Sequence, residues 1–230
     1  MTRLLPILLM LLALFAWIRI SAWQSGKQLR RTSRPLTNDQ IEALLARLAR
    51  TAGIERIDVR ILDMPMINGL ATPEGEIYLT RGLFRNFQAG RITAPELASV
   101  VAHELGHLAL GHTKRRILDV SSAQAVHLVL GSILNRFIPF LGWIVAQWIA
   151  TFVVTRLSRK DEFEADAYAT ALMIRAGLGA EPQARMLEKL LELVPEAAAH
   201  EMNWLASHPP VAERTRAIRE NANRWAATAG

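Results

Sequence analysis

The chain has 230 residues, of which 51% are hydrophobic, and it carries a formal net charge of +6 without a single cysteine. The lack of cysteine excludes disulfide bonds, thiol catalysis and thiolate-bound metals, so any metal site must use histidine, aspartate or glutamate. The basic residues are spread along the chain without a recognised nucleic-acid-binding pattern, and we expect no nucleic-acid partner. The high apolar content instead indicates that part of the chain meets a membrane.

The N-terminal part of the chain is predicted to be an apolar segment followed by a basic one. Residues 4–18 carry no charged side chain, so residues 1–22 are either a transmembrane anchor or a signal peptide. The lack of a clear cleavage site and the nearby Trp17 and Trp23 favour the anchor. Residues 23–36 are predicted to be a basic linker. The basic flank favours a cytoplasmic domain, whereas a signal-anchor interpretation favours export, so the membrane side stays open.

An amphipathic helix is predicted directly after this linker. Thr37 and Gln40 have the spacing of a capping box, and the apolar residues that follow fall on one helical face. Gly53 ends the pattern, because glycine commonly terminates helices. We therefore expect a helix over residues 37–53 whose apolar face packs on a core.

Two strands are predicted next. Residues 57–61 alternate apolar and charged side chains, as expected for a strand with one buried face. Residues 73–75 have the composition of a turn and lead into a second strand at residues 76–80. We expect these strands to belong to a small antiparallel sheet.

A second helix is predicted over residues 93–112, and it carries the sequence HELGH at residues 103–107. Thr93 and Glu96 again have capping-box spacing, and a proline such as Pro95 is tolerated in the first turn of a helix. The two histidines of the motif are therefore expected on a helix.

A second apolar region covers residues 123–157, and its part from 137 to 155 has no charged side chain. This insertion could span a bilayer, lie in its interface or form a buried hairpin. A membrane-facing helical hairpin is favoured by helix breakers and aromatic residues within it, namely Pro139, Gly142, Trp143 and Trp148. The chain from residue 158 onward is predicted to be helical.

The HELGH sequence has the spacing of a metal site. His103 and His107 lie one helical turn apart, so both imidazoles project from the same face and can bind one zinc ion. The neighbouring Glu104 can act as a general base toward water at the metal. A catalytic site also needs a third protein ligand and an open position.

Two kinds of residue could supply the third ligand. A histidine at HExxHxxGxxH spacing is excluded, because Thr113 stands at the ligand position and Ala109 at the glycine position. The other class takes a glutamate from a later helix, and Glu162 and Asp166 lie four residues apart in SRKDEFEADA. Glu162 can then bind the metal while Asp166 accepts a hydrogen bond from a ligand histidine and fixes its tautomer.

Four motifs occur in one order along the chain: NGLATPEGEIYLTRGLF, HELGH, SRKDEFEADA and SHPP. In this order they resemble the HtpX-like and BepA-like membrane-associated zinc metallopeptidases, the family that includes the Ste-type CAAX proteases. The resemblance covers roughly residues 38–220. It implies an α+β, mainly helical domain of the zincin-like (gluzincin) type at residues 37–230, with a small antiparallel sheet packed on the HExxH helix, an apolar membrane-facing insertion at 123–157 and an N-terminal membrane anchor.

The same resemblance implies a function and a location. It implies one Zn²⁺ per chain and hydrolysis of peptide bonds within membrane-associated or misfolded proteins, as in protein quality control. Proteins or peptides would be the substrates, and membrane lipid would contact the anchor and the apolar insertion. The bacterial inner membrane is the implied location, with the side of the catalytic domain open.

The resemblance also assigns roles to single residues. It assigns zinc ligation to His103, His107 and Glu162, proton transfer to Glu104 and the support of a ligand histidine to Asp166. Backbone hydrogen bonds to a peptide substrate would come from an edge strand formed by Glu76, Ile77, Tyr78, Leu79 and Thr80.

Other polar residues near these motifs are assigned as follows. His208 of SHPP would stand near the metal, where it either stabilises the oxyanion or occupies the open position in a resting form. Arg214 either pairs with an acid of the site or is an ordinary surface arginine. Asp161 and Glu164 are expected at the surface, and His112 is expected to be structural or exposed.

A second interpretation of the chain is a membrane-bound holdase or assembly factor with latent protease activity. The intact Glu104 argues against it, because a scaffold has no use for a general base. A prenyl-peptide protease of the CAAX type would need many spans around a chamber, which one or two apolar segments cannot build. We therefore expect a zinc-dependent endopeptidase that works without a covalent intermediate.

Overall fold

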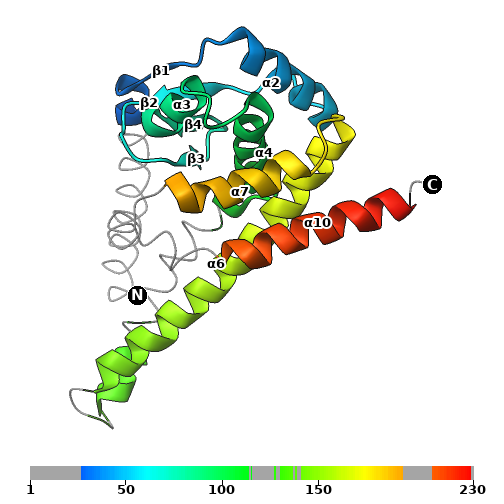
Figure 1. Ribbon diagram of the computed structural model, residues 1–230. Helices are drawn as coiled ribbons and strands as arrows, with labels where there is room; N and C mark the ends of the chain where they lie inside the picture. Colours follow the sequence, from blue (N-terminus) through cyan, green and yellow to red (C-terminus); the bar gives the residue numbers. More distant parts are fainter. Residues whose placement is uncertain are drawn as a thin grey trace, which may run out of the picture.

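The computed structural model describes residues 27–113, 115, 127, 130–136, 138, 141–193 and 209–228. The predicted anchor at residues 1–22 and His208 lie outside these residues. In chain order the elements are β1 (Ser33–Pro35), α2 (Asp39–Ala52), β2 (Val59–Leu62), β3 (Gly69–Ala71), β4 (Ile77–Thr80), α3 (Arg81–Gln88), α4 (Ala94–Ala109), α6 (Gly142–Arg175), α7 (Glu181–Leu193) and α10 (Val211–Thr228). Figure 1 shows a helical molecule with one small sheet, which confirms the predicted α+β, mainly helical class.

The sheet has the order β1-β2-β4-β3, and its central pair, β2 and β4, is parallel. The prediction of an antiparallel sheet was therefore wrong for this pair, although β1 pairs with β2 and β3 with β4 in antiparallel fashion. The reason is the short strand β3, which has no alternating pattern and was not predicted. It forms an antiparallel hairpin with β4. Because the chain reverses in this hairpin, β4 lies beside β2 and runs parallel to it.

The start of the domain differs from the prediction in two places. Residues 33–35, assigned to a linker, form the edge strand β1, in which Arg34 pairs with Ile61. Helix α2 is capped by Asn38 rather than by Thr37, because the Asn38 side chain accepts a hydrogen bond from the backbone N–H of Ile41 at 3.0 Å. Its predicted end at Gly53 is confirmed, with φ at 71°.

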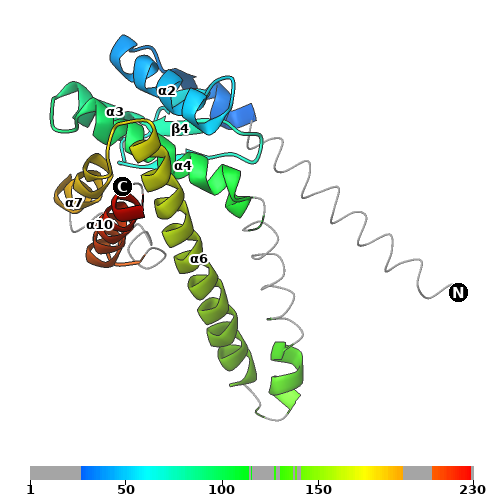
Figure 2. The same ribbon diagram turned by 90° about the vertical axis from the view of Figure 1, so that its right-hand side faces the viewer.

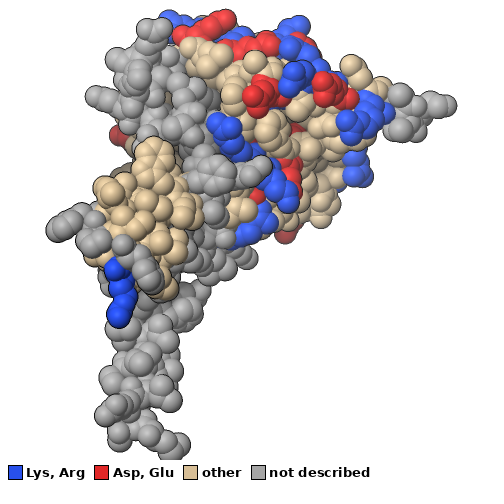
Figure 3. Space-filling view, turned by 90° about the horizontal axis from the view of Figure 1, so that it is seen from below, with Lys and Arg blue, Asp and Glu red and all other residues tan. Residues whose placement is uncertain are grey.

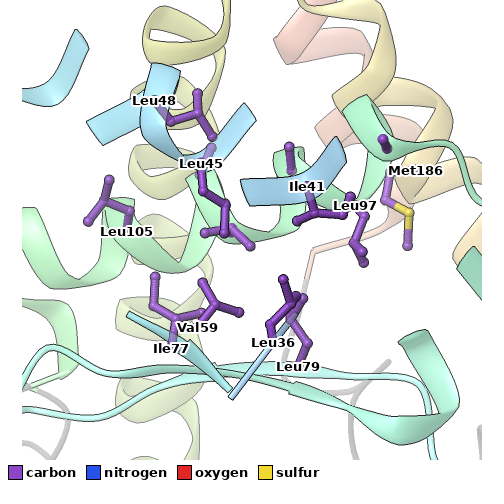
Figure 4. Packing of buried hydrophobic residues seen from close by; sticks show 14 of the residues in the cluster. Leu36, Ile41, Leu45, Leu48, Val59, Ile77, Leu79, Leu97, Leu105 and Met186 are labelled. Atoms are coloured by element: carbon purple, nitrogen blue, oxygen red, sulfur yellow. The ribbon is translucent and has the colours of Figure 1, made fainter. Parts of the chain in front are cut away.

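The core lies between the sheet and helices α2 and α4. Figure 4 shows apolar side chains of the sheet facing those of the two helices, including Val59, Ile77 and Leu79 on one side and Ile41, Leu45, Leu97 and Leu105 on the other. Each such side chain contributes about 1.5–3 kcal/mol when fully buried. The predicted capping box of Thr93 and Glu96 starts α4, so one end of this helix is fixed by its own sequence.

Helix α6 is a single helix of 34 residues, and it crosses α4 closely. The separate helix predicted from residue 158 is thus the second half of a longer one. Gly106 of α4 faces Ala165 of α6, and a Cβ atom at position 106 would lie only 3.0 Å from the Ala165 carbonyl oxygen. The glycine lets the two backbones approach, while α7 and α10 pack beside the crossing (Figure 2). The histidine face of α4 therefore meets the acidic part of α6.

The first half of α6, Leu141 before it and the helical residues 130–136 share an exposed apolar surface, which we call the apolar tip. Residues 130–136 pack against α6, since a Cβ atom at Gly131 would lie 2.3 Å from the Trp143 ring. Figure 3 shows this end of the molecule as an area with few charged side chains. Its exposed residues include Ile133, Leu141, Ile144 and Trp148, the last of which is 74% exposed. Among the helices of the described residues, none combines the length and apolar character needed to cross a bilayer.

Candidate metal centre

Three predicted ligands meet where α4 crosses α6. The Nε2 atoms of His103 and His107 lie 3.1 Å apart. Glu162 reaches from α6, with its Oε2 atom 3.4 Å from His103 Nε2 and its Oε1 atom 3.4 Å from His107 Nε2. All three side chains are largely shielded from solvent. Residues far apart in the sequence therefore bring two imidazole nitrogens and a carboxylate to one point.

The donor atoms at this point fit a tetrahedral zinc ion. Ligands about 2.0–2.1 Å from a tetrahedral metal stand about 3.3 Å apart. The observed separations of 3.1 and 3.4 Å agree with this value. Two imidazoles and one carboxylate are also a donor set that suits zinc.

His103 is oriented by the carboxylate of Asp166. The His103 Nδ1 atom lies 3.0 Å from Asp166 Oδ1, which leaves Nε2 for the metal position. Burial alone would lower the pKa of His103, but its hydrogen bonds with Asp166 and Glu162 outweigh this effect and raise the pKa to about 10. A metal ion at Nε2 would therefore compete with a proton for this nitrogen.

Asp166 in turn is held by the buried Arg214. The guanidinium donates two hydrogen bonds, of 2.7 Å to Oδ2 and 2.8 Å to Oδ1, and lies 3.5 Å from Glu162. Burial raises the pKa of Asp166, but Arg214 and His103 outweigh it and lower the pKa to about 2. Gln183 adds a hydrogen bond of 3.3 Å to the same carboxylate. The open question about Arg214 is thus answered, because it pairs with an acid of the site.

Glu104 lies beside strand β3. A Cβ atom at Gly69 would stand 3.3 Å from Glu104 Oε1 and 2.9 Å from Val100 Cγ1. The edge strand thus passes directly along the carboxylate that was predicted to act as general base. Because position 69 is a glycine, no side chain of the strand occupies the space beside this carboxylate.

The predicted edge strand at Glu76, Ile77, Tyr78, Leu79 and Thr80 was placed wrongly. Residues 77–80 form β4, which is hydrogen-bonded to β2 on one side and β3 on the other, so its backbone cannot pair with a substrate. Its side chains are buried, and Glu76 accepts hydrogen bonds from Arg30 and from the Tyr78 hydroxyl. The edge on the side of Glu104 is β3 instead.

A second polar cluster lies next to the three ligands, and the sequence interpretation missed it. His112 Nδ1 lies 3.1 Å from His107 Nδ1, and His112 Nε2 lies 3.1 Å from Glu164 and 3.8 Å from Asp161. Asp161 is only 3% exposed and is also bound by Arg115, so its assignment to the surface was wrong. Positions 161 and 164 share a helical face distinct from that of 162 and 166, and this spacing was the available signal.

Two histidines one turn apart on a helix, an intervening glutamate and a carboxylate from a later helix define a class. This arrangement is the one expected of an HExxH metallopeptidase that takes a glutamate as its third ligand. The sequence profile of peptidase family M48 matches residues 35–222. The chain belongs to peptidase family M48, which confirms the family resemblance.

Individual relatives agree with this assignment at low identity. The chain is 27% identical over 172 residues to the mitochondrial metalloendopeptidase OMA1 of Arabidopsis thaliana, covering 74% of this chain and 33% of that protein. It is 28% identical over 161 residues to the metalloprotease LoiP of Escherichia coli (strain K12), covering 67% of this chain and 58% of LoiP. A protease HtpX homolog of Acidiphilium cryptum (strain JF-5) is 28% identical over 217 residues, covering 80% and 74%. The chain thus spans about a third of OMA1 and somewhat over half of LoiP.

Proposed function

We propose that this protein is a zinc-dependent endopeptidase that cleaves peptide bonds within protein substrates. The observation that carries the proposal is the convergence of His103, His107 and Glu162 at separations that suit a tetrahedral ion. Membership of peptidase family M48 supports the same activity. Zinc bound by these three residues would supply Lewis acidity, which lowers the pKa of water and polarises a peptide carbonyl.

The remaining steps fall to side chains of the chain itself. Glu104 takes the proton from the attacking water and delivers it to the leaving amine, so that no covalent intermediate is needed. Asp166 accepts the Nδ1 hydrogen bond of His103 and keeps its Nε2 directed at the metal position. Arg214 keeps Asp166 ionised and so preserves this arrangement. His208 retains both sequence-based roles, oxyanion stabilisation or occupation of the open position.

A peptide substrate would bind as an added strand on β3. This strand stands at the edge of the sheet and passes the Glu104 carboxylate, so an extended peptide beside it would bring a peptide bond to the general base. Binding through backbone hydrogen bonds needs an extended segment and little side-chain specificity. This requirement suits misfolded proteins, in which such segments are exposed, and supports a role in protein quality control.

The apolar tip is proposed to contact membrane lipid. Its exposed apolar residues, with Trp148 at 74% exposure, have the composition of a segment that enters a lipid interface. The proposed organisation is an anchor at residues 1–22, a basic linker from residue 23 to the first strand, and a catalytic domain with this tip inside the insertion 123–157. Location at a bacterial inner membrane follows from the same proposal.

The test is zinc content and casein cleavage by the full chain in mild detergent. We expect wild type to bind about one zinc and to cleave, Glu104→Gln to bind zinc without cleaving, and His103→Ala to lose both. Glu188→Gln is the matched control, because this half-exposed acid of α7 pairs with Arg219 and is none of the predicted site residues named above, so the change should leave both properties unchanged. Cleavage by Glu104→Gln would refute the mechanism. Zinc binding without cleavage in every variant would favour a holdase.

A further inference from the structure

His112 is placed against a ligand histidine by the end of helix α4. The helix ends at Ala109, and Gly111 adopts a left-handed conformation with φ at 72°. Other residues adopt this conformation at a cost of about 1–2 kcal/mol, so glycine suits the turn. The turn brings His112 back onto α4, where it is 2% exposed and its Nδ1 lies 3.1 Å from Nδ1 of His107.

The contacts of these two rings allow one arrangement of hydrogens when a metal is bound. Nε2 of His107 faces the other two ligands and must be free of hydrogen to bind a metal, so the ring hydrogen is on Nδ1. That N–H then donates to His112 Nδ1. His112 carries its own hydrogen on Nε2, and it donates to Glu164 Oε2 at 3.1 Å. The opposite tautomer of His112 would point a bare nitrogen at a carboxylate.

We propose that His112 is a positioning residue for the metal centre, which holds His107 in the tautomer and ring orientation that present Nε2 to the metal. This inference rests on the metal site proposed above. Each ligand histidine then has its own partner: Asp166 contacts His103 directly, whereas Glu164 acts on His107 through the imidazole of His112. The acidic run of α6 thus serves both ligand histidines from two of its faces.

The cluster of His112, Asp161 and Glu164 also has the donor atoms of a metal site, since these atoms lie within 4.8 Å of one another. Two contacts favour the positioning role instead. The Arg115 guanidinium already binds Asp161, and the Lys160 ammonium lies 3.4 Å from Glu164. The positive charge that a cation would bring is therefore supplied by side chains.

The tautomer of His112 can be measured without any variant. In the zinc-loaded full chain labelled with ¹⁵N-histidine, long-range nitrogen–hydrogen correlation spectra distinguish the two ring tautomers. We expect His112 to carry hydrogen on Nε2 alone, and His107 to carry it on Nδ1 with Nε2 bound to zinc. Hydrogen on Nδ1 of His112 would overturn the proposal.

The energetic effect is measured by zinc affinity in competition with a chelator. We expect His112→Phe, which fills the space without an acceptor, to weaken zinc binding roughly 10–100-fold, the usual effect of removing a partner of a ligand histidine. His112→Asn keeps an acceptor near the Nδ1 position and should recover most of this loss, which a merely structural role would not predict. Glu164→Gln, at a partly exposed position, should weaken binding less than His112→Phe.

The outcomes separate this inference from the proposed function. If wild type binds no zinc, the proposed function fails with it. If wild type binds one zinc and His112→Phe binds it equally well, only the role of His112 is refuted. Binding of two zinc ions per chain, with the second lost in Glu164→Gln, would show that the cluster is a metal site. Circular dichroism of the metal-free variants controls for folding.

Discussion

Replacing Arg214 by methionine removes the only guanidinium that the described structure places on the buried Asp166. Arg214 is 3% exposed and donates two hydrogen bonds to this carboxylate, at 2.7 and 2.8 Å. Methionine has a similar length and fills much of the space, so packing changes little. The variant leaves Asp166 with His103 and Gln183 as its polar side-chain partners.

Two magnitudes bound the expected loss of stability. The pKa of Asp166 falls from its ordinary value of 3.8 to about 2, and a fall of that size corresponds to about 2 kcal/mol of interaction in the ionised state. Removing one partner of a buried ion pair commonly costs about 3–5 kcal/mol, because an uncompensated charge stays buried. Since His103 still faces the carboxylate, we expect a loss at the low end of the second range and above the first value, about 3 kcal/mol at pH 7.

The sign of the pH dependence follows from the lowered pKa. A carboxyl with a lowered pKa in the folded state stabilises the protein above its ordinary pKa, and this contribution disappears as the pH falls toward the folded-state value. The difference in unfolding free energy between wild type and Arg214→Met should therefore have its largest value at pH 7. It should shrink between about pH 4 and pH 2.

The assay is guanidinium unfolding of the metal-free full chain in mild detergent, followed by circular dichroism. Arg219→Met is the matched control, because Arg219 pairs with Glu181 and Glu188 at the surface and such pairs are worth about 0–1 kcal/mol. We expect Arg214→Met to lose several times more stability than this control at pH 7. Equal losses in the two variants would refute the assignment of Arg214 to a buried pair that supports the metal centre.

Two further predictions concern the edge strand and the apolar tip. Gly69→Ala should displace Glu104 and lower kcat roughly 10–100-fold, while the zinc content stays at the wild-type level. Steady-state kinetics and metal analysis check both values. An unchanged kcat would show that the added methyl group does not displace the carboxylate. Because the chain has no cysteine, Trp148→Cys offers a single labelling site, and a fluorophore there should be quenched by brominated lipids in vesicles. The same label at the exposed Glu42→Cys should not be quenched, and equal quenching at both positions would contradict lipid contact by the tip.

Local features of the structure were predictable where the sequence itself carries the interaction. The capping box of Thr93 and Glu96 needs only residues three apart, and it was predicted with its helix. His103 and His107 share a face because of helical geometry alone. For the same reason the pair Glu162 and Asp166 could be assigned to one face of a later helix, and the structure brings both to the histidines.

Features that depend on how elements cross could not be predicted in this way. Strand β3 has three residues and no alternating pattern, so its place at the edge, and with it the parallel pairing of β2 and β4, depends on the folded hairpin. The environment of Asp161 was misjudged because an acidic run on an isolated helix is ordinarily solvated. Only the crossing with α4 buries one flank of that run under His112 and Arg115.

Two glycines are local sequence features on which the crossing of elements depends, because each stands where a backbone must approach the site. Gly106 lets α6 lie against α4, and without that approach neither Glu162 nor Glu164 reaches its histidine. Gly69 lets the edge strand pass beside Glu104, so a peptide bound as proposed on that strand would lie within reach of the same carboxylate. A side chain at either position would separate the elements that supply the proposed ligands, the proposed general base and the edge strand proposed to bind substrate. The two glycines therefore belong to the chemistry of the site as much as its charged residues do.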